Sequence, residues 1–590
     1  KGGVVGNPLY DAQLNIRDES KYNQTTNNFS IEWNMLKGLT LRAALGISKQ
    51  NNSSDKFLPP SHSDYSKTSY QENDNFFRKG KYDYTSGEQS NLNGNLTLSY
   101  FKEWKVKHQL YAGFDYFISQ TKDVNYSFYA KGFTNDEMDF WGNALQYKEG
   151  SKPQGSESTS RQVGFTGNVN YTFNNRYFVD LSYRVDGSSQ FGSKKRFAPF
   201  WSTGIGWNVH NETFMKERWE FMDKLRLRLS YGETGSVQFS SYDALRMFEY
   251  FTTDRYLIFN GADLKGLGNE NLEWQITDEW NGGIEVSLWN GLVTGQIDLY
   301  SKKTSNLLSS MDVVPSTGFD SYRANIGEVK NTGFEAMLST YLLRDTEREL
   351  IWMITGRIVH NKNQITKLSD AIKQQVEEYK AQNMENTQLL SEGDSQTTIY
   401  AVPSLGIDPS TGRELFLDKN GKITDVWDLA ACRNFGDTEP KYRGNINTMF
   451  SWQDLTMNLS FAYQWGGQQY NKTLLNKVEI VESEIKNNVD NRVFSDRWQK
   501  PGDVKPFKAY SDERTKASSR FVMDDNVFQL QAISIQYRWR SKFLQQHLRL
   551  QSLDFNLNLS DVFYISSIKR ERGTTYPFSR KVNFSVALMF

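Results

Sequence analysis

The side chains that most often carry metal or redox chemistry are scarce in this chain and lack the spacing that such sites need. Its five histidines form no HExxH motif and no pair at metal-binding spacing. The single cysteine, Cys432, can form neither an intrachain disulfide nor a cysteine-based metal site. The segment DKNGKITD, residues 418–425, resembles a calcium loop, but its glycine stands fourth instead of sixth and no glutamate closes the loop. We therefore predict a hairpin turn there, and neither a metal nor a cofactor.

Carboxylates are abundant, and chance alone places some pair of them at the spacing of a glycosidase site. Nothing distinguishes one Asp or Glu pair from the others, so we predict that the protein is not an enzyme. Binding chemistry is easier to place, because aromatic rings in loops offer flat apolar surfaces to a ligand while charged and amide groups beside them form hydrogen bonds. Ordinary packing within the loops is the alternative interpretation of the same side chains. The candidates for substrate binding are Phe140, Trp141, Tyr250, Phe251, Trp427, Arg184 and Asp186.

The elements that would position these side chains show a period of two residues, which is typical of a β-strand with one apolar face. LTMNLSFAYQW at 455–465 and KLRLRLSY at 224–231 alternate in this way. The last ten residues, KVNFSVALMF, do so up to the final Phe590. After Leu530 the apolar phase is displaced by one residue and resumes at Ile533, which predicts a β-bulge. The chain is therefore predicted to consist of long strands that are apolar on one side.

Short and long connections alternate between the predicted strands. In an up-and-down meander every second connection lies at the same end of the sheet, so one end carries short turns and the other carries long loops. Aromatic residues gather beside the short turns, as amphipathic rings do at the border of a membrane. The predicted short turns lie at 36–38, 102–104, 174–176, 290–291 and 453–454, and the long loops cover roughly 49–89, 124–158, 234–273, 361–440 and 466–525.

This pattern predicts an all-β fold, a transmembrane up-and-down antiparallel β-barrel with long extracellular loops. The predicted strands run for about nine to eleven residues, the length of a tilted membrane strand, whereas strands of a soluble sandwich, the alternative fold, usually have about five to six. Counting from the C-terminus gives about 17 strands, an odd number that complete bacterial barrels do not have. Plugged barrels have about 22 strands. We therefore predict that residues 1–590 are the C-terminal portion of a plugged barrel, and that the N-terminal plug and the first strands are absent from this chain.

Charge and hydropathy exclude two other classes of protein. The chain has 69 basic and 69 acidic residues, so it lacks the positive charge typical of a nucleic-acid binder. Its longest apolar runs, such as LIWMI at 350–354, are far shorter than the ~20 residues of a membrane-spanning helix. We predict no nucleic-acid partner and contact with outer-membrane lipid through strands.

The side chains of two arginines on one predicted strand can be assigned a direction. In a barrel, Arg226 and Arg228 would point into the lumen close to a short turn, because an inward charge faces water whereas an outward one would face lipid. Because this end of the lumen is close to the short turns, we predict that the two arginines face a plug and not a ligand. The strand that carries Arg184 and Asp186 also runs away from a short turn, so we expect these two residues to lie nearer the mouth of the barrel.

A series of longer motifs occurs in order along most of the chain. It resembles the SusC-like TonB-dependent outer-membrane transporters of Bacteroidetes, and no single motif would be enough. The motifs are RVDGSSQFGSKKRFAPFWSTGIGWNVHNETFM (184–215), KLRLRLSYGETGS (224–236), GNENLEWQITDEWNGGIEV (268–286), NIGEVKNTGFE (325–335), GIDPSTGRELFLDKNGKIT (406–424), DTEPKYRGN (437–445) and the closing GTTYPFSRKVNFSVALMF.

The resemblance implies active import of oligosaccharides or peptides across the bacterial outer membrane. It further implies a SusD-like lipoprotein that acts as a lid, energy delivered through TonB, and a dimeric assembly. Outer-membrane proteins of this kind typically end in an aromatic residue that the assembly machinery reads, a role that falls here to Phe590. A TonB-dependent transporter for siderophores or cobalamin and a passive porin are the alternatives. Residues 371–390 are expected to form a helix in an extracellular loop.

Overall fold

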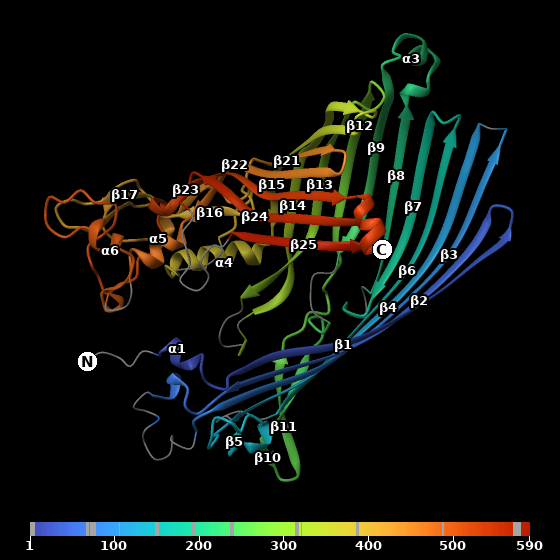
Figure 1. The fold of residues 1–590 in the computed structure, drawn as a ribbon. Coiled ribbons are helices and arrows are strands. Elements are labelled where there is room, and N and C mark those ends of the chain that lie inside the picture. The colour runs from blue at the N-terminus through green and yellow to red at the C-terminus, as the bar shows by residue number, and fades with distance from the viewer. Residues whose placement is uncertain are drawn as a thin grey trace. The chain divides into compact units, whose positions relative to one another are not determined.

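The fold is all-β, as predicted, and consists mainly of long antiparallel strands (Figure 1). The structure is a computed structural model. Contacts divide the chain into two units that are described separately: unit 1 is Lys1–Tyr171, Asp180–Trp201 and Val237–Trp274, and unit 2 is Thr172–Val179, Ser202–Ser236 and Gln275–Phe590. The residues described are 6–66, 70, 78–105, 107–147, 153–191, 196–236, 241–312, 318–319, 321–384, 389–485, 489–569 and 580–590.

The main sheet has 18 strands in the described part of the chain, one of which, β5 (Gln146–Tyr147), has only two residues. Setting β5 aside leaves 17 strands, the number expected from the sequence. They are β1 (Arg17–Leu36), β2 (Leu39–Leu58), β3 (Lys81–Trp104), β4 (His108–Lys131), β6 (Gln154–Phe173), β7 (Tyr177–Ser188), β8 (Phe197–Asn208), β9 (Met222–Ser236), β12 (Gln275–Leu288), β13 (Val293–Asp312), β14 (Ser321–Asp345), β15 (Leu350–Leu368), β21 (Tyr442–Trp452), β22 (Leu455–Tyr470), β23 (Val522–Trp539), β24 (Ser552–Ser566) and β25 (Lys581–Met589).

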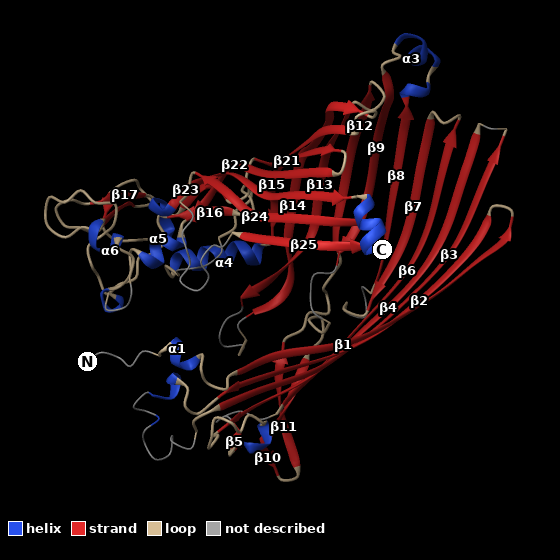
Figure 2. Ribbon diagram, viewed as in Figure 1, coloured by secondary structure: helices blue, strands red, loops and turns tan. Residues whose placement is uncertain are grey.

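Smaller elements, among them the helices of the described residues, lie at the ends of these strands (Figure 2). The small strands are β10 (Met247–Tyr256) with β11 (Phe259–Gly266), β16 (Thr398–Ala401) with β20 (Arg433–Asp437), and β17 (Ser404–Ile407) with β18 (Glu414–Leu417) and β19 (Ile423–Thr424). The helices are α1 (Pro8–Asp11), α3 (Thr213–Arg218), α4 (Asp370–Ala381), α5 (Lys472–Lys477) and α6 (Arg492–Ser495), with short turns of helix η1 (Ser63–Ser66), η3 (Trp141–Asn143), η4 (Val209–Asn211), η6 (Leu429–Ala431), η7 (Glu482–Glu484), η8 (Ser519–Phe521) and η9 (Leu544–Leu548).

The strands are longer than the sequence predicted. β1 and β2 have 20 residues each, and β14 has 25, whereas about nine to eleven were expected. The pairing of β1 with β2 continues to Arg17, although residues 17–28 are polar on nearly every position. The apolar stripe in the sequence marks only the part of a strand that lies in apolar surroundings. The hydrogen bonds between neighbouring strands continue beyond that part. For the same reason the predicted loops 49–89 and 124–158 are too long, because both include strand residues.

The apolar face of unit 2 is continuous from β9 to β25. Residues directly opposite one another on neighbouring strands share a face. Ile284 is opposite Leu227 and Ile297, and half-exposed apolar side chains continue along this face. Further opposite pairs on it are Leu459 with Ile533, Ile533 with Leu559, Ile535 with Leu557, Leu557 with Phe584, and Leu553 with Leu588.

The other face of unit 2 is polar. Glu285 is opposite Arg226 and Gln296. Asn558 is opposite Ser534 and Asn583. Unit 1 has the same two faces, one with Trp33, Leu41, Leu98 and Phe114 in register, and one with Glu32, Arg42, Thr97 and Asp115 in register.

The predicted bulge is confirmed. Ser460 pairs with Ala532 and Phe461 with Leu530, so Gln531 has no opposite residue on β22. The extra residue returns the apolar side chains of β23 to one face, which is why the alternation in the sequence is displaced there.

Short turns and long connections are at opposite ends of the strands, as predicted. Asn174 and Asn175 take the left-handed conformation in the turn between β6 and β7, with φ of 54° and 53°, as a two-residue hairpin turn requires. Gly38 lies in the turn after β1 with φ of 83°, and a Cβ there would be 2.1 Å from the carbonyl oxygen of Phe101. The turn expected at 102–104 lies slightly later, since β3 continues to Trp104. These ends are called below the short-turn end and the long-loop end.

The predicted loop helix is present but shorter than expected. Helix α4 covers Asp370–Ala381, begins at the cap Ser369, and buries Ile372 and Val376. Asn383 has φ of 55°, a left-handed conformation that cannot continue a helix. Residues 385–388 of the predicted 371–390 segment lie outside the described part of the chain.

The C-terminal strand carries the exposed apolar stripe seen in the sequence. Val582, Phe584, Val586 and Leu588 are all exposed, and Phe590 is 80% exposed. Among the described strands, β25 pairs with β24, and β1 pairs with β2. Each of these two strands therefore has one edge with which no described strand pairs.

Candidate ligand-binding site in the loop lobe

The long-loop end of β15, β21, β22 and β23 carries a compact group of short elements (Figure 1). We call residues 369–441 and 471–521 the loop lobe. One core of the loop lobe joins α4 to the sheet through Ile372, Val376 and Ile365, and a second gathers Val478 and Phe521. The described part of the lobe is therefore held together by its own packing.

A cavity of about 860 Å³ opens in the loop lobe between two stretches of chain. One is the turn and strand from Thr411 to Phe416, and the other is the segment from Lys508 to Lys516. Trp427 closes one side. Basic and acidic side chains are mixed in the lining, for example Arg413 and Asp425, which pair at 2.7 Å. Such a lining can bind the hydroxyls of a sugar or the amides and termini of a peptide.

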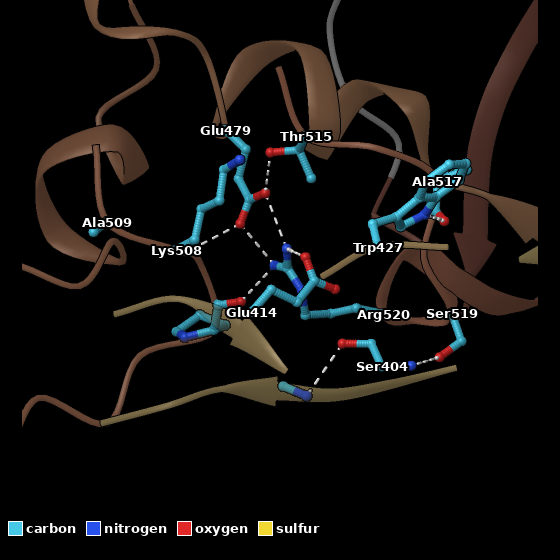
Figure 3. A network of polar contacts seen from close by, with 12 residues as sticks. Ser404, Glu414, Trp427, Glu479, Lys508, Ala509, Thr515, Ala517, Ser519 and Arg520 are labelled. Carbon is cyan, nitrogen blue, oxygen red and sulfur yellow. Dashed lines mark hydrogen bonds and ion pairs between the residues drawn. The ribbon is translucent and has the colours of Figure 1, made fainter. Parts of the chain in front are cut away.

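One buried arginine ties the two stretches together (Figure 3). Arg520 donates to Glu414 on β18 at 2.9 Å and forms an ion pair with Glu479 at 2.7 Å. The Arg520 side chain is 12% exposed, and those of Glu414 and Glu479 are 5% and 0% exposed. Burial of Glu479 by itself raises its pKa, but the hydrogen bonds and positive charge of Arg520 outweigh it and hold that pKa below the ordinary value.

The rest of this network fixes the segment that lines the cavity. The backbone N–H of Lys508 donates to Glu479 at 2.9 Å, and the hydroxyl of Thr515 donates to the same carboxylate at 2.7 Å (Figure 3). Arg497, fully buried, donates to the carbonyl oxygens of Ile480 and Ala509, both at 2.8 Å. The shape of the cavity therefore depends on a few buried charges.

Acid should loosen this lobe. A carboxylate whose folded pKa lies below its unfolded value, about 4.3 for Glu and about 3.9 for Asp, adds stability that is present above the unfolded value and is lost as the pH falls through the folded pKa. Glu479 is such a group, and so is Asp490, whose pKa the hydrogen bond from Arg492 lowers to about 2. We expect hydrogen exchange of lobe peptides, corrected for intrinsic rates, to show lower protection at pH 3 than at pH 6. The Glu479→Gln variant should show a smaller dependence, and equal protection of the wild-type lobe at both pH values would contradict the prediction.

The predicted site residues are placed in both units. Of the five aromatic candidates, Trp427 lines the cavity, but it is only 7% exposed, donates its indole N–H to the carbonyl of Ala517 at 2.8 Å, and has the ammonium of Lys516 4.9 Å from its ring centroid. This ring is a wall of the cavity more than an open stacking surface.

The other aromatic candidates lie in unit 1 and are exposed. Phe140 and Trp141 contact each other with ring centroids 5.2 Å apart. Tyr250 and Phe251 lie on β10, and Tyr250 is 70% exposed. Their role in binding remains a prediction.

Arg184 and Asp186 form a pair on β7. The guanidinium of Arg184 donates to both carboxylate oxygens of Asp186 at 2.6 Å. They share a face because they are two residues apart on a strand. The pair is consistent with a polar patch, but each charge is already satisfied.

The buried arginine network could not be found from sequence pattern. Glu414 and Glu479 are 106 and 41 residues from Arg520 along the chain, and neither glutamate stands in a motif with it. The one local signal was GIDPSTGRELFLDKNGKIT, which contains Glu414. As expected from the sequence, DKNGKITD forms a turn, in which Asp418 accepts from the backbone of Asn420 and Lys422.

Two findings concern other kinds of site. No group of three or more His, Cys, Asp or Glu side chains in the described residues is arranged to hold a metal ion. No helix in that part of the chain has the length and apolar character needed to cross a membrane. Cys432 is partly buried, and burial raises the pKa of its thiol to about 11, so this thiol is not activated.

Residues 2–490 match the family described as "TonB dependent receptor-like, beta-barrel". The chain belongs to this family. As a β-barrel domain of a TonB-dependent receptor, it has curated relatives in Bacteroidetes. "TonB-dependent receptor P39" of Formosa agariphila is 24% identical over 95% of this chain and 56% of that protein. "TonB-dependent receptor SusC" of Bacteroides thetaiotaomicron is 26% identical over 62% of this chain and 35% of that protein. The chain spans about half the length, or less, of the curated relatives it matches.

Solved structures share the fold of this receptor barrel domain. The structure titled "Structure of the RagAB peptide transporter" has a TM-score of 0.82 at 20% identity and covers 95% of this chain and 60% of that one. The RagAB peptide importer in the "open-open" state has a TM-score of 0.83 at 20% identity and covers 99% of this chain and 62% of that one. The resemblance to SusC-like transporters expected from the sequence motifs is confirmed.

In this receptor domain the two arginines predicted to face a plug lie on the polar face of β9. Arg228 pairs with Glu285 at 3.2 Å and with Asp298 at 2.7 Å. The guanidinium of Arg226 lies 4.2 Å from the ring centroid of Phe178, and its buried Nε has no hydrogen-bond partner among the described residues. The buried Nε of Arg228 likewise has no hydrogen-bond partner among the described residues, but its two ion pairs neutralise the charge of Arg228 within the sheet.

Proposed function

We propose that the intact protein is an active transporter of the outer membrane that imports oligosaccharides or peptides. In this proposal the short-turn end faces the periplasm, the long-loop end faces the exterior, a SusD-like lipoprotein acts as a lid, and TonB supplies energy. The observation that carries it is a TonB-dependent receptor sheet whose long-loop end bears a folded lobe with a cavity of about 860 Å³. A cavity of that volume accepts a ligand of several residues or sugar units.

The similarity to SusC and to a structure titled as a peptide transporter supports an oligomeric nutrient as cargo. The mixed charges of the cavity suit either class. A siderophore or cobalamin transporter is the first alternative and a passive porin the second. The roles of Phe140, Trp141, Tyr250, Phe251, Arg184 and Asp186 in substrate binding, of Arg226 and Arg228 toward a plug, and of Phe590 in assembly stay predictions, as do the missing plug and first strands, the absence of enzymatic activity and a dimeric assembly.

Co-purification tests the proposal directly. We expect the full-length protein, tagged and extracted from outer membranes in mild detergent, to carry one lipoprotein per barrel. Uptake of its oligomeric substrate by cells should stop when TonB is deleted or the proton gradient is collapsed. A barrel that purifies alone and binds an iron chelate would favour the siderophore alternative, and uptake that survives the loss of TonB would favour a porin.

A further inference from the structure

A groove of about 410 Å³ lies on the apolar face of unit 1, where β3, β4, β6, β7 and β8 contribute side chains. Its floor is formed by Leu92, Ile118, Val163 and Phe197. None of these residues belongs to the loop lobe or to the candidates for substrate binding.

The position of the groove on the apolar face follows from the strand register. Leu92 is opposite Ile47 on β2 and opposite Gln120 on β4, so all three share a face. Arg161 joins that face because its Nε donates to Oε1 of Gln120 at 2.8 Å. If this face meets lipid, the groove meets lipid too.

A glycine shapes one wall of the groove. A Cβ at Gly187 would lie 2.5 Å from the ring of Phe197, closer than two carbon atoms can approach. Because Gly187 has no side chain, the ring of Phe197 packs directly on the backbone of β7. The ring is 60% exposed and presents an apolar surface to the groove, which suits a hydrocarbon chain.

One rim of the groove presents hydrogen-bond donors. Arg161 has no carboxylate partner among the described residues, so its terminal nitrogens are available. Gln120 accepts from Arg161 through its amide oxygen, which leaves its NH₂ group to donate. The hydroxyl oxygen of Ser189 accepts from the backbone N–H of Arg161 at 2.9 Å, so its hydrogen is free as well. A guanidinium, an amide and a hydroxyl that all donate form a site for an anion.

Charges farther along the same face mark the border of the apolar region. Lys49 pairs with Glu88 at 2.8 Å, and Lys122 pairs with Glu157 at 2.8 Å. Lys49 and Lys122 are both opposite Ser90, two residues from Leu92 and nearer the long loops. Within the part of this face that the structure describes, Arg161 has no acidic partner. It therefore lies at the level where a membrane presents phosphate groups.

We propose that this groove binds one phosphate-bearing lipid of the outer leaflet. Its acyl chain lies along Leu92, Ile118, Val163 and the ring of Phe197, and its phosphate is held by Arg161, Gln120 and Ser189. The proposal rests on the membrane location and orientation given under the proposed function. It adds a lipid ligand that is separate from the cargo.

Native mass spectrometry of the full-length protein, purified from outer membranes in mild detergent, tests this. We expect the wild type to retain one phosphorylated lipid. Arg161→Gln removes the charge, and Gly187→Val displaces the ring of Phe197 from the wall of the groove, so each should lower the occupancy on the order of tenfold. The matched control is Arg42→Gln on the polar face, where Arg42 pairs with Glu32, and it should retain the lipid. A heat-dependent shift on gels shows for each variant that the barrel is folded.

Two results would overturn the lipid site: equal retention by Arg161→Gln and the wild type, or retention only of lipids without phosphate. The proposed function fails in a different way. A protein that is absent from the outer-membrane fraction contradicts the membrane location, whereas a protein that fractionates there without a phosphorylated lipid contradicts only the groove.

Discussion

Replacing Arg520 with methionine is expected to unfold the cavity of the loop lobe while leaving the sheet intact. The substitution keeps much of the side-chain volume but leaves the buried carboxylates of Glu414 and Glu479 without their cation. Breaking a buried ion pair by removing one partner typically costs about 3–5 kcal/mol. Local opening of the lobe should then become frequent.

Limited proteolysis and hydrogen exchange of peptides within 404–417 and 478–515 measure this effect. The matched control is Arg514→Met, which removes an exposed pair with Glu484 at 2.9 Å and should cost less than about 1 kcal/mol. Arg520→Lys keeps the charge but not the two-pronged geometry, so an intermediate effect is expected. Equal protection of the lobe in Arg520→Met and Arg514→Met would show that the network does not stabilise the cavity.

Placing a charge on the apolar face of the sheet is expected to impair membrane assembly. Ile284 lies between Leu227 and Ile297 on that face and is 44% exposed. In a bilayer, Ile284→Arg would bring a guanidinium into contact with lipid, which costs about 2–4 kcal/mol near the midplane. The control is Asn281→Arg on the polar face of the same strand, opposite Ser230 and Tyr300. A charge facing a water-filled lumen should cost little.

The folded fraction of each variant after insertion into liposomes, read from the heat-dependent gel shift and from urea unfolding, gives the comparison. We expect a clear loss for Ile284→Arg alone. If both variants were as stable as the wild type, the apolar face would not be in lipid, because exposed substitutions in water usually change stability by less than about 0.5 kcal/mol.

The strands of this protein could be predicted because a strand has a simple period. The alternation in KVNFSVALMF and LTMNLSFAYQW reappears as the continuous apolar face of unit 2, and the displaced phase after Leu530 reappears as a bulge. Turn residues such as Asn174 and Asn175 also act locally, since their backbone conformation favours a tight hairpin. The lengths of the strands were underestimated because the strands remain paired where both faces of the sheet meet water. In those parts of the strands apolar and polar residues no longer alternate.

The candidate site was predictable only in part. Trp427 was selected as an aromatic residue in a loop, and it does line the cavity, but its burial and its contact with Lys516 were not visible in the sequence. The groove at Gly187 had no signal at all, since its lining comes from five strands.

The amino-acid sequence by itself determined the all-β class, the two faces of the sheet and the resemblance to SusC-like receptors. It also determined that short turns lie at one end of the strands and long loops at the other. Each of these depends on residues near one another in the chain. Only the tertiary structure decided which charges meet. Arg520 finds Glu414 and Glu479 because the folds of two long connections bring them together, and the free energy of a buried ion depends on that proximity and on the exclusion of water. No local pattern encodes either quantity.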